Sequence, residues 1–208
     1  MAERTGIAAI VLAAGSSSRF GADKLRHPYP HKGITLPLSA HSLLPWLQVF
    51  DRVTVVVRAE ALPLRMAIEA ALGRQQAAQL RWAICSDAAE GMGASLCCGV
   101  QANQAASGWL IGLADMPEVP AQAIMQVRAA LASGASIVAP VHGGRRGHPV
   151  GFDAVWLNAL LSLQGDEGAR SVLQAHASAI TLLPLADAGI YHDVDRRADL
   201  PDPARLAK

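Results

Sequence analysis

The chain contains 208 residues, of which 51% are hydrophobic and 17% are charged. Its 18 Lys and Arg residues nearly balance its 17 Asp and Glu residues, so the formal net charge is +1. This length and apolar content predict a single domain over residues 1–208. Because the charge is near neutral and only 4% of the residues are aromatic, we expect neither a nucleic-acid surface nor a membrane surface. The expected partner is a small molecule.

The three cysteines, Cys85, Cys97 and Cys98, show no C-x-x-C or Cys/His ligand spacing. They predict reduced thiols in a cytoplasmic protein rather than a disulfide framework. Residues 7–14 imitate the apolar part of a signal peptide, but Glu3 stands in the flank that should be positive. We therefore interpret this run as a strand.

Continuous apolar runs predict strands that are buried on both faces. These runs cover residues 7–13, 52–57, 80–85, 109–113 and 136–140. Helical patterns between them cover residues 39–49, 61–72, 95–105 and 120–133, while the Pro-rich run 28–37 is interpreted as one loop. The alternation predicts an α/β fold with a doubly wound, mostly parallel sheet.

The first strand runs directly into GSSSRFGADK, residues 15–24. Ligands of doubly wound sheets bind beyond the carboxyl ends of the strands. Gly15 and Gly21 permit close approach of the backbone, the serines leave N–H groups for anionic oxygens, and Arg19 and Lys24 add positive charge. The loop matches neither of the two common phosphate-loop patterns. It predicts a phosphate site, and the alternative is a flexible surface turn with two solvated cations.

Two further positions carry acids that suit a metal site. Asp115 follows the strand at 109–113, too far before the helix at 120 to cap it, so it is a candidate Mg²⁺ ligand. Asp193 and Asp195 are two residues apart, which on an extended segment places both carboxylates on one face. A solvated turn is the alternative for this second pair.

Six motifs together resemble the molybdenum cofactor cytidylyltransferase family, which belongs to the nucleotidyltransferases with a glycosyltransferase-A-like, Rossmann-like fold. The resemblance covers nearly the whole chain, and the motifs occur in the family's order. They are LAAGSSSRFGADK at 12–24, GMGASL at 91–96, LADMP at 113–117, RGHPVGF at 146–152, GDEGAR at 165–170 and DVDRRADL at 193–200.

The resemblance implies transfer of CMP from CTP to the phosphate of Mo-molybdopterin, giving molybdopterin cytosine dinucleotide and pyrophosphate, with Mg²⁺ as cofactor. It implies that Arg19 and Lys24 hold the triphosphate and act in catalysis together with Asp115, which would hold Mg²⁺ with Asp195. Attack of the acceptor phosphate at the α-phosphorus concentrates negative charge on the phosphate oxygens, and cations stabilise this charge. Because the attacking phosphate is already anionic, no strong general base is needed. The implied nucleotide-binding residues are Leu12, Ala13, Ala14, Gly15, Ser16, Arg19, Lys24 and Ser95.

The resemblance also implies acceptor binding by Gly147, His148 and Pro149. For His148 the alternative is a hydrogen-bonded loop histidine, and for Ser95 it is a helix N-cap. In GDEGAR, the favoured interpretation is a structural loop in which Arg170 pairs with Asp166.

The chain departs from the family at two places. LRHPYPHKGITLP at 25–37 replaces a leucine-rich stretch and a glycine turn, which leaves the path of this loop open. DRRAD at 195–199 stands where the family has D-T-P-E-D, which leaves open whether Asp195 or Asp193 is the second metal ligand.

The prediction that the nucleotide base is cytosine depends on Ala14. Guanylyltransferase relatives have L-A-G-G where this chain has Leu12 to Gly15, and the extra methyl of Ala14 favours exclusion of a larger purine. A guanylyltransferase, a sugar- or polyol-phosphate nucleotidyltransferase and a non-catalytic molybdopterin-binding maturation factor remain open as competing interpretations. The implied protein partner is a molybdoenzyme that receives the product.

Overall fold

The computed structural model describes residues 6–17 and 19–201. Its main sheet runs in the order β10-β7-β9-β6-β1-β4-β5, with β8 paired to β7. Strand β1 pairs in parallel with β4 and β6, β4 with β5, and β7 with β10, whereas β9 is antiparallel to both of its neighbours. The strands are β1 (Ala8–Leu12), β4 (Val53–Arg58), β5 (Leu80–Cys85), β6 (Gly108–Leu113), β7 (Ile137–His142), β8 (Arg145–Arg146), β9 (Val150–Asp153) and β10 (Ile180–Pro184). The predicted mostly parallel α/β sheet is confirmed.

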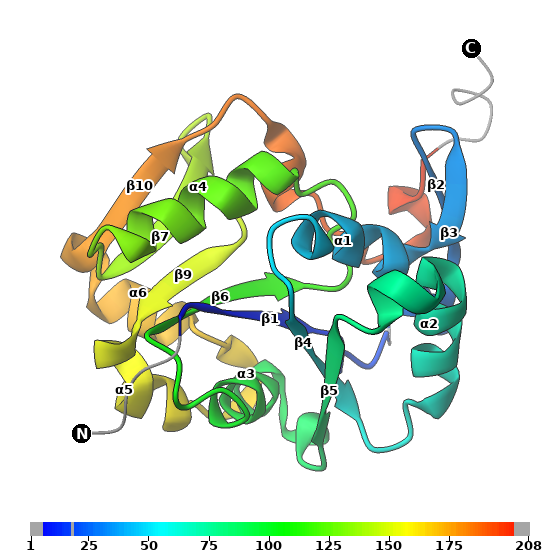
Figure 1. The fold of residues 1–208 in the computed structure, drawn as a ribbon, viewed down its shortest axis with the longest axis horizontal. Coiled ribbons are helices and arrows are strands. Elements are labelled where there is room, and N and C mark those ends of the chain that lie inside the picture. Colours follow the sequence, from blue (N-terminus) through cyan, green and yellow to red (C-terminus); the bar gives the residue numbers. More distant parts are fainter. Residues whose placement is uncertain (1–5, 18, 202–208) are drawn as a thin grey trace.

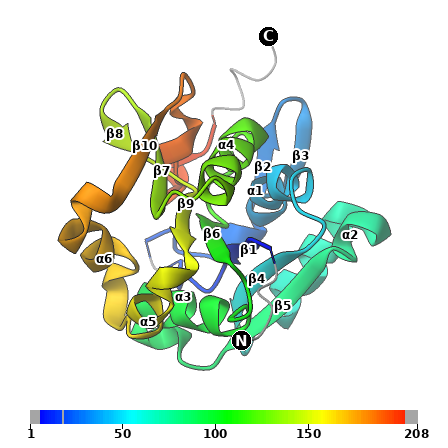
Figure 2. The same cartoon turned by 60° about the vertical axis from the view of Figure 1, so that its left-hand side comes forward.

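Helices cover both faces of this sheet (Figure 1). The longer ones are α1 (Leu38–Leu47), α2 (Leu62–Ala77, interrupted at Gly73), α3 (Met92–Gln101) and α4 (Ala121–Ala132). The shorter ones are α5 (Leu157–Leu161) and α6 (Arg170–Ala175), which lie on the side of α3 in Figure 2.

Alternate residues of β1 enter two different cores, because successive strand side chains point to opposite faces. Ala9 and Val11 belong to the core under α1, α2 and α4, while Ile10 and Leu12 belong to the core under α3, α5 and α6. All four side chains are buried. The continuous apolar run that predicted a strand covered on both faces therefore has its physical explanation.

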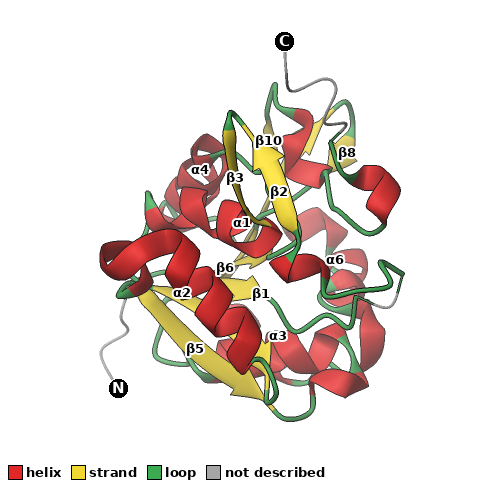
Figure 3. Ribbon diagram, turned by 90° about the vertical axis from the view of Figure 1, so that its right-hand side faces the viewer, coloured by secondary structure: helices red, strands yellow, loops and turns green. Residues whose placement is uncertain are grey.

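The prediction of one loop over residues 28–37 is wrong. This segment forms a hairpin of β2 (Pro28–His31) and β3 (Ile34–Pro37), visible beside α1 in Figure 3. The two-residue turn Lys32-Gly33 has φ values of 50° and 78°, as primed hairpin turns require. The prolines are tolerated because a two-stranded hairpin consists only of edge strands.

Two other details differ from the sequence interpretation. Helix α3 begins at Met92 rather than at 95, and residues 150–184 contain strands and short helices that the apolar pattern did not predict. Within the described residues, the structure contains no helix that is both long and apolar enough to cross a membrane.

Candidate active site

Lys24, Asp115 and Asp195 meet at one edge of the sheet, although they lie far apart in the chain. Lys24 Nζ donates to Asp115 Oδ2 at 2.7 Å and to Asp195 Oδ1 at 2.9 Å. Arg19 Nη1 donates to the other oxygen of Asp195, Oδ2, at 2.8 Å. Parallel strands present their carboxyl ends at the same edge, so the loops after β1 and β6 lie next to each other there. Two cations and two carboxylates form a connected network.

Local structure aims each of these side chains. Lys24 begins a short 3₁₀ helix, and its backbone N–H donates to Ser17 Oγ at 3.4 Å, which closes the glycine-rich loop. The N–H of fully buried Val194 donates to Asp115 O at 3.0 Å, so the C-terminal segment is attached to the loop after β6. Asp195 is thereby held beside Asp115. Ser18, the remaining serine of the predicted phosphate loop, and Glu3 lie outside the described residues.

The network fixes the charges of its members. Burial by itself lowers the pKa of Lys24, but the carboxylates of Asp115 and Asp195 outweigh it, and the pKa is raised above its ordinary value. The hydrogen bond from Lys24 is the main reason that the pKa of Asp195 is lowered. An ammonium that is 9% exposed therefore stays charged beside the ionised carboxylate of Asp195.

The residues present fit a divalent cation that shares its ligands with a substrate. Asp115 Oδ1 is buried and has no hydrogen-bond partner, so it is available as a ligand. Asp195 is the second acid beside it, whereas no hydrogen bond or ion pair of Asp193 occurs among residues 6–17 and 19–201. No group of three or more His, Cys, Asp or Glu in this described part could hold a metal ion alone. Two carboxylates completed by phosphate oxygens are what Mg²⁺ commonly uses.

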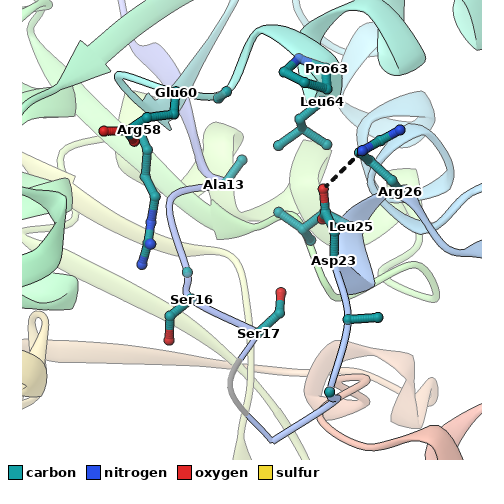
Figure 4. A pocket seen from close by; sticks show the side chains of 14 residues that line it. Ala13, Ser16, Ser17, Asp23, Leu25, Arg26, Arg58, Glu60, Pro63 and Leu64 are labelled. Carbon is teal, nitrogen blue, oxygen red and sulfur yellow. Dashed lines mark ion pairs between the residues drawn. The ribbon is translucent and has the colours of Figure 1, made fainter.

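The glycine-rich loop borders a cavity of about 490 Å³ between β1 and α2 (Figure 4). Ala13, Gly15 and Ser16, three of the predicted nucleotide-binding residues, line it together with Arg58 and Glu60. Ala14 is buried, and Leu12 lines a different cavity on the opposite side of the sheet edge. Four of the eight predicted nucleotide-binding residues thus line these two cavities, whereas Ala14, Arg19, Lys24 and Ser95 line neither of them.

Arg58 is a site residue that the sequence interpretation missed. It ends β4, and its Nε donates to Ala14 O at 2.6 Å, so it holds the turn that follows β1. Its side chain reaches down toward Ser16 in Figure 4. The signal available in the sequence was a basic residue at the carboxyl end of the next predicted strand.

Ser95 lies within α3, so its interpretation as a helix N-cap is wrong. The N-cap is Gly91, and Ser95 Oγ donates back to Gly91 O at 3.4 Å. A side chain at Gly91 would collide with the backbone of Gly165, and one at Gly93 with the backbone of Gln164, so glycine is required at both positions. Ser95 is only 5% exposed.

The predicted acceptor residues Gly147, His148 and Pro149 form a tightly fixed loop with a cis peptide bond before Pro149. A Cβ on Gly147 would collide with the backbone of Ile190, and the His148 N–H donates to Ile190 O at 2.6 Å. His148 Nδ1 also lies 3.5 Å from Ile111 O, in agreement with a hydrogen-bonded loop histidine. Burial lowers the pKa of this imidazole more than that contact and nearby acids raise it, so it is neutral near pH 7.

GDEGAR is a structural loop, as expected, because its Gly165 and Asp166 pack against Gly91 at the start of α3. The expected pairing within it is wrong: in the described part of the chain, Arg170 forms no ion pair with Asp166. Arg170 instead lines a cavity of about 370 Å³ with His148 and Leu12.

A mostly parallel sheet with a glycine-rich cationic loop and a carboxylate pair at its carboxyl edge defines a nucleotide-handling α/β protein. Residues 9–180 match the family described as MobA-like NTP transferase domain. The chain belongs to this family, which makes it a nucleotidyltransferase of the MobA-like type.

A sequence relative and several solved structures are similar to most of this chain. The purine catabolism protein PucB of Bacillus subtilis (strain 168) is 32% identical over 194 residues, covering 89% of this chain and 90% of PucB. The crystal structure of Rv0371c from Mycobacterium tuberculosis H37Rv has a TM-score of 0.74 at 23% identity, covering 98% of this chain and 97% of that one. A second structure of that protein is a manganese complex, with a TM-score of 0.71, 22% identity and 98% coverage of both chains. Molybdopterin-guanine dinucleotide biosynthesis protein A from Archaeoglobus fulgidus has a TM-score of 0.59 at 15% identity, covering 97% and 96%.

Proposed function

We propose that the protein transfers CMP from CTP to the phosphate of Mo-molybdopterin, giving molybdopterin cytosine dinucleotide and pyrophosphate. The observation that carries the proposal is the buried ammonium of Lys24 between Asp115 and Asp195, at the end of the glycine-rich loop. This arrangement supplies fixed positive charge and metal-ligating oxygens at one point, as phosphoryl transfer requires.

The chain's own residues position and neutralise phosphates. Lys24 and Arg19 are the catalytic cations, which bind triphosphate oxygens and stabilise the charge that develops at the α-phosphorus. Asp115 and Asp195 hold Mg²⁺, which when bound with the nucleotide neutralises its phosphate oxygens. The acceptor phosphate is already anionic, so no side chain has to remove a proton from it. Residues 12–15 border the base and ribose, and residues 147–149 face the acceptor.

Base choice rests on Ala14, whose methyl stands where guanylyltransferase relatives have glycine. The structure of a guanine dinucleotide biosynthesis protein among the similar folds makes GTP the second candidate. Transfer to a sugar or polyol phosphate is a third candidate, and a non-catalytic molybdopterin carrier is a fourth. We further propose that a molybdoenzyme receives the product, and that the protein works in the cytoplasm, where its three free cysteines stay reduced.

Pyrophosphate release from CTP, GTP, ATP and UTP in parallel tests the proposal, with Mg²⁺ and Mo-molybdopterin present and the pterin product analysed by mass. The expected result is CTP-dependent release with a cytosine dinucleotide product. Ala14→Gly is the matched variant for base choice and should raise turnover of GTP relative to CTP. Preference of the unaltered protein for GTP would overturn the role of Ala14 in base choice. Tight nucleotide binding without pyrophosphate release would establish the carrier role instead.

Omission of Mg²⁺ tests the metal assignment. With EDTA present, turnover should fall to background and return when Mg²⁺ is restored, while Asp115→Asn should stay inactive at saturating Mg²⁺. Full turnover in EDTA would contradict the assignment of Asp115 and Asp195.

A further inference from the structure

The cavity of about 370 Å³ lies on the α3 side of the site, and both apolar and charged side chains line it. Apolar side chains from β1, β6, β9 and α3 form the floor. Its charged lining residues are Arg146 from β8, Glu167 from the GDEGAR loop and Arg170 from α6. The floor residues are Leu12, Leu96, Ile111, Leu113, Val150 and Phe152.

The three charged side chains have no other evident task. Among residues 6–17 and 19–201, neither Arg146, Glu167 nor Arg170 forms an ion pair. The neighbouring Arg145 differs, because its guanidinium lies 4.4 Å from the ring centroid of Tyr191 and lines another hollow. Two unpaired cations and one unpaired carboxylate facing an apolar hollow indicate a ligand with complementary groups.

The residues that line the cavity indicate which chemical groups a ligand must have. An apolar floor accepts a fused aromatic ring, and arginine forks bind phosphate oxygens in a bidentate manner. A carboxylate accepts two hydrogen bonds at once from adjacent ring N–H and amino groups, which a 2-amino-4-oxopyrimidine ring presents. Pterins and guanine share this ring edge. His148 is neutral, so the charged side chains that line the cavity are those of Arg146, Glu167 and Arg170.

We propose that this cavity is the acceptor pocket, in which Glu167 recognises the 2-amino-4-oxo edge of a pterin while Arg146 and Arg170 bind its anionic groups. The proposal rests on the function proposed above and adds the residues that select the acceptor. Leu113, which lies two residues before Asp115 in the chain, and His148 both line this cavity. A sugar or polyol phosphate can donate hydroxyl hydrogen bonds to Glu167 but lacks the two adjacent, coplanar N–H donors, so the pocket favours a pterin over such acceptors.

Binding titrations with small pterins test the proposal without the full acceptor. The probes are 6-hydroxymethylpterin monophosphate and the matching lumazine, in which an oxygen replaces the 2-amino group. The unaltered protein should bind the pterin at least about tenfold more tightly, because a hydrogen bond to a charged group is lost with lumazine. Glu167→Gln should abolish that preference. Equal binding of the two probes by the unaltered protein, or no measurable binding of either, would overturn the proposal.

The arginines require their own comparison. Arg146→Ala and Arg170→Ala should each weaken the pterin monophosphate about tenfold or more and leave unphosphorylated 6-hydroxymethylpterin unchanged. Arg145→Ala is the matched control and should leave both affinities unchanged. An equal effect of all three variants would show a diffuse electrostatic contribution and contradict the assignment.

Nucleotide titrations distinguish a pterin from guanine as the ligand whose 2-amino-4-oxo edge contacts Glu167. If Glu167→Gln weakened GTP binding and left the pterin unaffected, the cavity would be a guanine site and the proposal would fail. Failure here is distinguishable from failure of the proposed reaction: CTP-dependent pyrophosphate release can persist without the pterin preference, and the preference can persist without turnover.

Discussion

Replacing Lys24 with Met removes the charge at the centre of the carboxylate network and keeps a side chain of similar length. Lys24 is 9% exposed, and its two partners are 20% and 37% exposed. Breaking a fully buried pair costs about 3–5 kcal/mol, and the partial exposure of the carboxylates reduces this to roughly 2–3 kcal/mol. For a chain of this size the melting temperature should fall by roughly 4–12 °C.

The loss of stability in Lys24→Met should depend on pH in a defined direction. Because the hydrogen bond from Lys24 lowers the pKa of Asp195 in the folded state, its stabilisation is present above the ordinary value of 3.8 and is lost as pH falls through the lowered value. The pKa of Lys24 is raised, so its own contribution persists from neutral pH up to the ordinary value of 10.5. The difference between the two proteins should therefore be full at pH 7.5 and smaller at pH 3.5.

Thermal unfolding at both pH values and pyrophosphate release at pH 7.5 are the assays. Turnover of Lys24→Met should fall by a factor on the order of 10² to 10³. Arg19→Gln is the control for stability, because Arg19 is 70% exposed and its loss should change the melting temperature by less than about 2 °C. A Lys24→Met protein that melts with the unaltered one at pH 7.5 would refute the ion-pair argument. Near-normal turnover would refute the catalytic assignment.

Arg58→Ala should raise KM for the nucleotide about fivefold to tenfold, because the turn at Ala14 loses a hydrogen bond; steady-state kinetics would contradict this if KM stayed constant. Burial raises the pKa of Glu118, but hydrogen bonds with His192 and Tyr29 outweigh burial and lower it. The stabilisation by Glu118 is therefore present above pH 4.5 and lost as pH falls further. Glu118→Gln should thus destabilise by about 1 kcal/mol at pH 7 and by less at pH 4 in urea titrations, and an equal loss at both would oppose this account. Gly112→Ala should cost about 2–3 kcal/mol, because its Cβ would enter the ring of Trp46; unchanged urea stability would show that the ring can shift.

The sequence allowed prediction of those features that depend on short stretches of chain. The strand at 8–12 and the cationic loop after it were predictable because a buried run ends where glycine and basic residues begin. Asp115 stood out because an acid at the end of a buried strand lacks a structural reason. The contact of Asp195 with Lys24 could not be predicted, since it joins two distant segments, and the choice of Asp195 over Asp193 as second metal ligand stays a prediction.

Other features could not be predicted because tertiary packing overrides local propensity. Lys32-Gly33 forms a hairpin turn although lysine rarely adopts a positive φ, so the turn was not evident from the sequence. The prolines around it indicated a loop instead of two strands. Gly91 and Gly93 lower helix propensity, yet α3 starts there because the GDEGAR loop packs against them. The sequence marked Arg58 as a basic residue at the end of a predicted strand, but its bond to the backbone carbonyl of Ala14 could not be predicted from side-chain spacing.

The separation of Lys24 from Asp195, 171 positions along the chain, has a consequence for synthesis of the protein. A ribosome adding about 5–20 residues per second needs about 10–30 s between these two residues. Throughout that time the nascent chain has the glycine-rich loop without Asp195, and β1 exists before β6 can flank it. The proposed nucleotide site is therefore incomplete until synthesis has passed Asp195, and a product truncated before this residue is expected to compete poorly for the substrate.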